Sequence, residues 1–208
     1  MAHAVARLPS PSASRRLLGL AGILGGAALL AAFVVDIAPD LNNVRLILFN
    51  LGAIAVVVAH RQHVAASPTL VALVAGATML ANAWYLSMVL LSIDRPNPFG
   101  GGFGLVFFWA AVAMWLSDAA FGVVILRLGA VSRWGALVLA IGSLLAFTGI
   151  DRLGLTSPAN PTIFGPVSLI GIALNGLGWI LLGLDVATRA GAPAARPRQH
   201  QHEVKPGR

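Results

Sequence analysis

One carboxyl group lies deep inside an apolar stretch of this sequence, and three side-chain amides lie at similar depth in other stretches. Asp118 precedes Arg127 by nine residues, about 13 Å along a helix. Asn50, Asn82 and Asn175 stand near the middle of three further stretches. A carboxyl group surrounded by amides can carry a proton or bind a small ligand. The same residues can instead be structural, as interhelical hydrogen bonds of about 0.6 kcal/mol each.

A second set of charged residues recurs in two segments between apolar stretches. Asp94-Arg95 is followed by an Asn-Pro pair, and so is Asp151-Arg152. An acid and a base at a helix exit can pair, and Asn-Pro favours a turn. We interpret the four charged residues as an outer-loop motif shared by two helical hairpins. Coincidence among residues that are common in loops is the alternative.

Composition indicates which elements carry these side chains. Of the 208 residues, 58% are hydrophobic and 10% are charged, whereas a soluble domain has about 25% charged residues. This excludes an ordinary soluble enzyme, a disordered chain and a soluble nucleic-acid binder. A membrane-spanning helix needs about 20 mostly apolar residues, and six segments qualify or nearly do. They are 17–35, 44–59, 69–93, 103–126, 134–150 and 163–184.

The sequence therefore predicts an all-α integral membrane protein, a bundle of six transmembrane helices. The shortest segment, 44–59, can be lengthened if Arg45 and His60 extend their side chains toward the two surfaces. The six spans form a domain over 17–188. A basic segment, 1–16, precedes it, and a basic, Pro-rich tail that we expect to be disordered, 189–208, follows it.

Basic residues set the predicted orientation. Eleven Lys and Arg residues fall in the two terminal segments and the second and fourth loops, against three on the other side. By the positive-inside rule both termini are cytoplasmic. Anionic lipid head groups are the expected partners of Arg15, Arg16 and the tail. The preference for Arg over Lys, with abundant Ala and Gly, indicates a bacterial protein of the cytoplasmic membrane.

The first apolar segment has a second interpretation. Arg15-Arg16 before an apolar run resembles a twin-arginine export signal. However, the run is longer than the 7–15 apolar residues of a usual signal. A first transmembrane helix is therefore the preferred interpretation. Cleavage of residues 17–35 as an export signal is the alternative.

Recognisable catalytic patterns are missing from the sequence. It has no cysteine, and it contains no nucleophile elbow, zinc-protease motif or phosphate-binding loop. We expect no cofactor or metal, no nucleic-acid partner and no enzymatic activity.

The favoured function is small-solute or proton-linked transport, or ligand binding, at the Asp118 level. The alternative is a structural or regulatory membrane subunit that acts through its outer loops or basic tail, alone, as a homo-oligomer or with a membrane-protein partner. An intramembrane enzyme would need a second ionisable group at that level.

Overall fold

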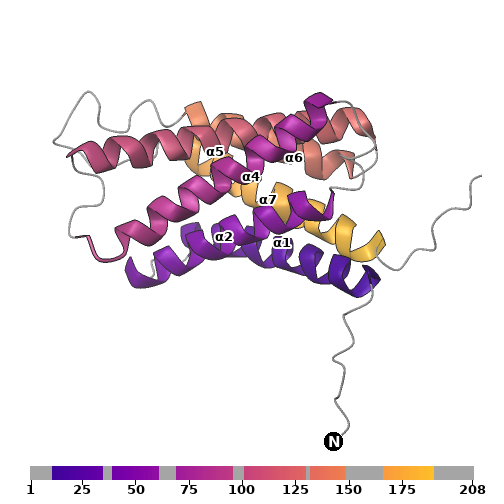
Figure 1. The fold of residues 1–208 in the computed structure, drawn as a ribbon, viewed down its shortest axis with the longest axis horizontal. Coiled ribbons are helices and arrows are strands. Elements are labelled where there is room, and N and C mark those ends of the chain that lie inside the picture. The colour runs from indigo at the N-terminus through magenta and orange to yellow at the C-terminus, as the bar shows by residue number, and fades with distance from the viewer. Residues whose placement is uncertain are drawn as a thin grey trace, which may run out of the picture.

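The computed structural model describes residues 11–34, 39–60, 69–95, 101–129, 132–148 and 166–189, and the regular structure within these ranges is α-helical (Figure 1). The helices are α1 (Pro11–Val34), α2 (Pro39–Ala59), α4 (Thr69–Ser92), α5 (Gly101–Leu128), α6 (Arg133–Thr148) and α7 (Pro166–Arg189). Each overlaps one of the six predicted segments, which confirms the all-α prediction. Helix α1 begins at Pro11, before the predicted span, so residues 11–16 are helical.

Four helices of the described part are long and apolar enough to cross a membrane. They are α1 over Ala13–Ala31, α4, α5, and α7 over Val167–Arg189. Helices α2 and α6 have shorter apolar stretches, Asn43–Ala59 and Arg133–Thr148. Large apolar side chains also face outward: Leu80 is 74% exposed and Trp134 is 73% exposed. Apolar side chains on the outside of apolar helices support a membrane-embedded protein.

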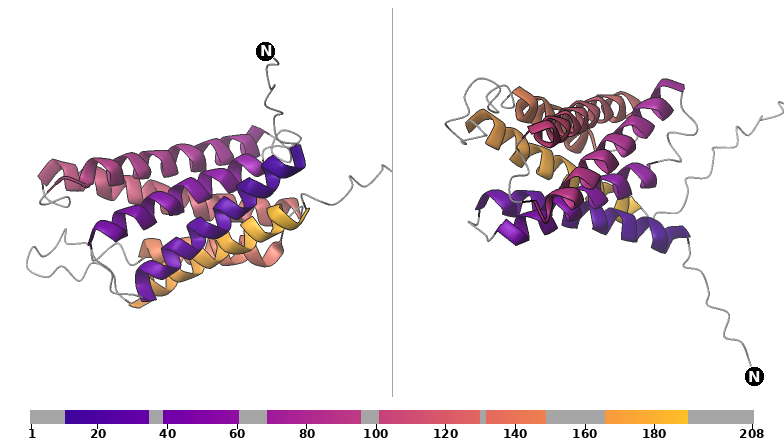
Figure 2. Two further views of the ribbon diagram at one scale, coloured as in Figure 1. Left: turned by 90° about the horizontal axis from the view of Figure 1, so that it is seen from below. Right: turned by 60° about the vertical axis from the view of Figure 1, so that its left-hand side comes forward.

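The six helices form a closed ring in which each contacts its neighbours in the chain. Helix α1 packs against α2, α2 against α4, α4 against α5, α5 against α6 and α6 against α7, and α7 returns to α1. The start of α1 and the end of α7 lie at the same end of the bundle (Figure 2). A Cβ added at Gly19 would come within 2.6 Å of the backbone nitrogen of Ala187, which shows how close these two ends are.

Glycines bring α1, α7 and α6 together at backbone distance. A side chain at Gly26 would collide with the carbonyl oxygen of Gly176, and one at Gly178 would lie 2.6 Å from Cα of Leu139. Gly22 and Gly26, four residues apart on α1, both lie against neighbouring helices of the same bundle. Small residues let helices approach closely where there is no hydrophobic driving force between them.

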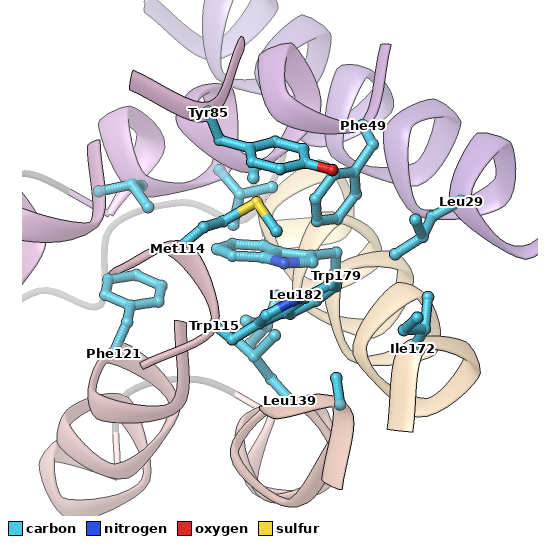
Figure 3. Close-up of a cluster of buried hydrophobic side chains, with 14 of the residues drawn as sticks. Leu29, Phe49, Tyr85, Met114, Trp115, Phe121, Leu139, Ile172, Trp179 and Leu182 are labelled. Atoms are coloured by element: carbon cyan, nitrogen blue, oxygen red, sulfur yellow. The ribbon is translucent and has the colours of Figure 1, made fainter. Parts of the chain in front are cut away.

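Aromatic side chains from α2, α4, α5 and α7 fill the centre of the ring (Figure 3). The Phe121 ring stacks on Trp179 with centroids 5.8 Å apart, and Phe49 lies 6.4 Å from Trp115. Trp179 and Phe49 are almost completely buried. The polar groups described below therefore lie among apolar and aromatic side chains, where each hydrogen bond is strengthened by the low local dielectric.

The two ends of α2 differ from the prediction. Arg45 is 8% exposed and His60 is 2% exposed, so neither side chain extends outward to lengthen the span. The His60 ring nitrogen Nδ1 lies 2.7 Å from the Val56 carbonyl oxygen, and the ring meets Phe121 edge-on at 6.2 Å. Contact with the last turn of α2 and with α5 thus holds His60 inside the bundle.

Candidate functional site

Asp118 on α5 is completely buried and accepts hydrogen bonds from three side chains. The Asn82 amide donates to Oδ1 over 2.9 Å. The Asn175 amide and the Trp179 indole donate to Oδ2 over 3.4 and 3.3 Å. The carboxyl group thereby links α5 to α4 on one side and to α7 on the other. Its two oxygens are held unequally, because only Oδ1 has a short bond.

Asn82 is fixed from two directions. Its Nδ2 atom donates to the Thr78 carbonyl oxygen and to Asp118, each over 2.9 Å. The Thr78 hydroxyl lies 2.9 Å from the Val74 carbonyl oxygen and 3.1 Å from the Ser117 carbonyl oxygen. Two side chains one turn apart on α4 therefore contact consecutive residues of α5. Helical spacing of i and i+4 explains why they share a face.

Asn175 extends the network to α6. Its Nδ2 atom also donates to the Ser143 hydroxyl over 2.7 Å, and that hydroxyl donates to the Leu139 carbonyl oxygen over 2.7 Å. Gly142, next to Ser143, makes this possible, because a side chain there would collide with the backbone nitrogen of Asn175. The network therefore spans α4, α5, α6 and α7.

Sequence reasoning missed Ser143 and Trp179. Trp179 follows Asn175 by four residues, so the two lie on one face of α7. That spacing could have identified Trp179 as a further donor, since a buried indole usually finds an acceptor. Ser143 carried no such signal, because a serine within an apolar helix commonly bonds only its own helix.

Three of the four predicted site residues meet, and the fourth does not. Asn50 is completely buried, but its amide nitrogen donates to the Leu46 carbonyl oxygen of its own helix over 2.7 Å. Among the described residues, no hydrogen bond joins Asn50 to Asp118, Asn82 or Asn175. Position along the helix did not determine the direction in which the Asn50 side chain points.

Several polar atoms in this region lack a hydrogen-bond partner. They are the side-chain oxygens of Asn50, Asn82 and Asn175, together with Nη2 of Arg45. A buried polar atom without a partner costs roughly 1–3 kcal/mol. Asn82 and Asn175 thus use their amide nitrogens in hydrogen bonds, while their amide oxygens have no partner. The network therefore directs several N–H donors at one carboxyl group and contains unpaired amide oxygens.

Within the described residues, the Asp118 carboxyl group is held by neutral donors and by no cation. The ion pair in the described part joins Asp185 to Arg189 on α7, with Nε 2.9 Å from Oδ1, as the i,i+4 spacing favours. No cluster of three His, Cys, Asp or Glu residues suited to a metal ion occurs there. An ionised carboxylate in hydrocarbon is costly unless it is paired. The arrangement is chemically suited to taking up and releasing a proton.

The outer-loop motif is only half within the described residues, since Asp151 and Arg152 lie outside them. Asp94 and Arg95 follow α4 and are both exposed. The Arg95 guanidinium lies 3.9 Å from the centre of the Phe103 ring, and its Nε donates to the Leu91 carbonyl oxygen over 3.2 Å. No ion pair between Asp94 and Arg95 is present among the described residues. Arg95 instead links the ends of α4 and α5 by a cation–π contact.

Comparison with protein-family models, curated proteins and solved structures finds no match to this chain.

Proposed function

We propose that this chain is a six-span protein of a bacterial cytoplasmic membrane with both termini in the cytoplasm. The co-location of the start of α1 and the end of α7 supports an even number of crossings. The basic residues at that end, including Arg15 and Arg16, support a cytoplasmic side and contact with anionic lipid. Helix α2 has 21 residues, about 31 Å of helix, which is enough to cross despite its short apolar stretch.

Within this membrane protein we propose that Asp118 is the proton-binding group of a small-solute transporter, without enzymatic activity. The observation that carries the proposal is a completely buried carboxyl group whose partners are three neutral N–H donors. A purely structural network needs no ionisable group, since amides and hydroxyls can bond one another across helices. An acid at this level is costly in hydrocarbon. Its presence is explained if the proton it binds is coupled to solute movement.

The test is proton movement in sealed vesicles. Purified full-length protein is reconstituted with a pH-sensitive dye inside. Na⁺, K⁺, amino acids and sugars are then added one at a time outside. We expect at least one solute to change the internal pH with wild type and no solute to do so with Asp118→Asn. The variant keeps the shape of the side chain but cannot exchange a proton.

A stability measurement separates loss of transport from loss of the folded structure. Thermal unfolding of wild type and Asp118→Asn is followed in detergent, with Asn50→Leu as a control at a buried amide outside the network. The proposal holds if Asp118→Asn unfolds as one cooperative unit and transport is lost only in that variant. Equal transport by wild type and Asp118→Asn, for any solute that is moved, overturns it.

The alternative proposal is a structural or regulatory subunit that acts through the outer loops or basic tail. The observation in its favour is that one network fastens α4, α5, α6 and α7 together. A structural network predicts that Asp118→Asn changes stability alone, with no solute moved by either protein. Association with a partner or with a second copy would then be the property to measure.

A further inference from the structure

The two oxygens of Asp118 have different neighbours, and the difference determines where a proton can bind. Oδ1 accepts one hydrogen bond of 2.9 Å from Asn82. Oδ2 has two longer contacts, 3.4 Å to Asn175 and 3.3 Å to Trp179. A protonated carboxyl oxygen becomes a hydrogen-bond donor and needs an acceptor. The N–H groups already directed at that oxygen must therefore move or reorient. This is easier at Oδ2, where both contacts are weak.

The Asn82 amide cannot supply that acceptor. Turning it over would direct its oxygen at the Thr78 carbonyl oxygen, which now accepts from Nδ2 over 2.9 Å. Two acceptors would then face each other without a proton between them. Trp179 cannot supply an acceptor either, because an indole N–H only donates.

The Asn175 amide, in contrast, can turn over and still bond both Asp118 and Ser143. Its Nδ2 atom bonds Asp118 and the Ser143 hydroxyl, and a hydroxyl group serves equally as acceptor or donor. After the turn, the Asn175 oxygen accepts from the protonated carboxyl group and also from Ser143. Ser143 then directs its proton to Asn175 instead of to the Leu139 carbonyl oxygen. That amide oxygen is buried and unpartnered in the structure.

We propose that Oδ2 is the proton-carrying oxygen of Asp118 and that the Asn175–Ser143 pair is the acceptor that reverses when it is protonated. One proton from the aqueous phase adds to Oδ2, and no bond between heavy atoms forms or breaks. Asn82 stays in place and holds Oδ1 in both states. Protonation on α5 is therefore transmitted to the contact between α6 and α7. The inference rests on the proposed proton-binding function and adds the residues that respond to the proton.

Other ionisable side chains lie around the site. Tyr85 on α4 follows Asn82 by three residues, about 4.5 Å of helix, and packs edge-on against Phe107, with centroids 5.2 Å apart. His60 touches Phe121, which stacks on Trp179. Apart from Asp118, the charged residues with described side chains on the helices around the site are Arg45 on α2, Arg127 on α5, Arg133 on α6, and Asp185 and Arg189 on α7. His60 is linked to the network through these two aromatic contacts, so it is removed in a control.

The experiment is a pH titration of the full-length protein in detergent by NMR, with ¹³C at the side-chain carbonyls of Asp and Asn. The Asp118 signal is identified by its loss in Asp118→Asn. The amide signals are identified by their loss in Asn50→Leu, Asn82→Leu and Asn175→Leu. We expect the Asn175 carbonyl to move downfield along the same curve as Asp118, because its oxygen gains two donors. The Asn82 and Asn50 carbonyls, whose oxygens stay unpartnered, should move by less than a third as much.

Two further variants test whether Ser143 and His60 contribute to the Asn175 shift. Ser143→Ala should reduce the Asn175 shift by about half, since one of its two new donors is gone. His60→Gln should leave the shift unchanged. A titrating Asp118 with a fixed Asn175, or with a moving Asn82, overturns this inference and leaves the proton-binding proposal standing. An Asp118 signal that does not titrate while the protein stays folded overturns both.

Discussion

The amide nitrogen of Asn82 lies 2.9 Å from Oδ1 of Asp118, and this is the shortest bond that the buried carboxyl group makes. It joins α4 to α5 in the middle of the bundle. The same nitrogen donates to its own helix at Thr78, so the amide is held at both of its hydrogens. The Asn82 amide therefore has a fixed orientation, whereas the Asn175 amide can turn over.

This relationship predicts a difference in stability between two buried amides. Asn82→Leu should lower the free energy of unfolding by about 1–3 kcal/mol, because it leaves Oδ1 of Asp118 buried without its partner. Asn50→Leu should change it by less than about 1 kcal/mol, because it removes a bond within one helix together with an unpartnered oxygen. Unfolding by a denaturing detergent, followed by circular dichroism, measures both. Equal losses in the two variants would contradict the special position of Asn82.

Glycine packing beside the site predicts a second contrast. Gly142→Ala should lower the free energy of unfolding by about 1–3 kcal/mol, because its methyl group collides with the backbone of α7 at Asn175. Gly76→Ala on α4 meets nothing within 4 Å and should be neutral or stabilising by about 0.5–1 kcal/mol. Thermal unfolding of both variants provides the comparison. A Gly142→Ala protein as stable as wild type would mean that α6 and α7 are less closely packed than described.

Absence of cysteine makes the proposed topology simple to check. Ile93→Cys and Arg127→Cys place single thiols at opposite ends of the α4–α5 hairpin, and both positions are exposed. With cytoplasmic termini, a membrane-impermeant maleimide added to intact cells should label only the Ile93 position. Labelling of the Arg127 position should need permeabilised cells. Labelling of both positions, or of the Arg127 position alone, in intact cells would refute the orientation.

The sequence by itself determined that the described part is all-helical, and the approximate position of each helix. Apolar runs such as 69–93 and 103–126 predicted α4 and α5 to within a few residues, because hydrocarbon forces the backbone to satisfy its hydrogen bonds within a helix. It also identified Asp118 as the central polar group, since a lone acid in an apolar run is costly. Distance along the chain placed Asn82 and Asn175 at the level of Asp118, and the structure joins both to it.

Only the tertiary structure decided which of these groups meet. Depth fixes a level along the membrane normal, but the rotation of each helix about its axis depends on packing against its neighbours. Helix α7 is set by the glycines that bring it against α1 and α6, which turns Asn175 and Trp179 toward Asp118. Helix α2 is turned so that Asn50 bonds only its own backbone among the described residues. Contacts between residues far apart in the sequence set these rotations, so no local pattern could reveal them.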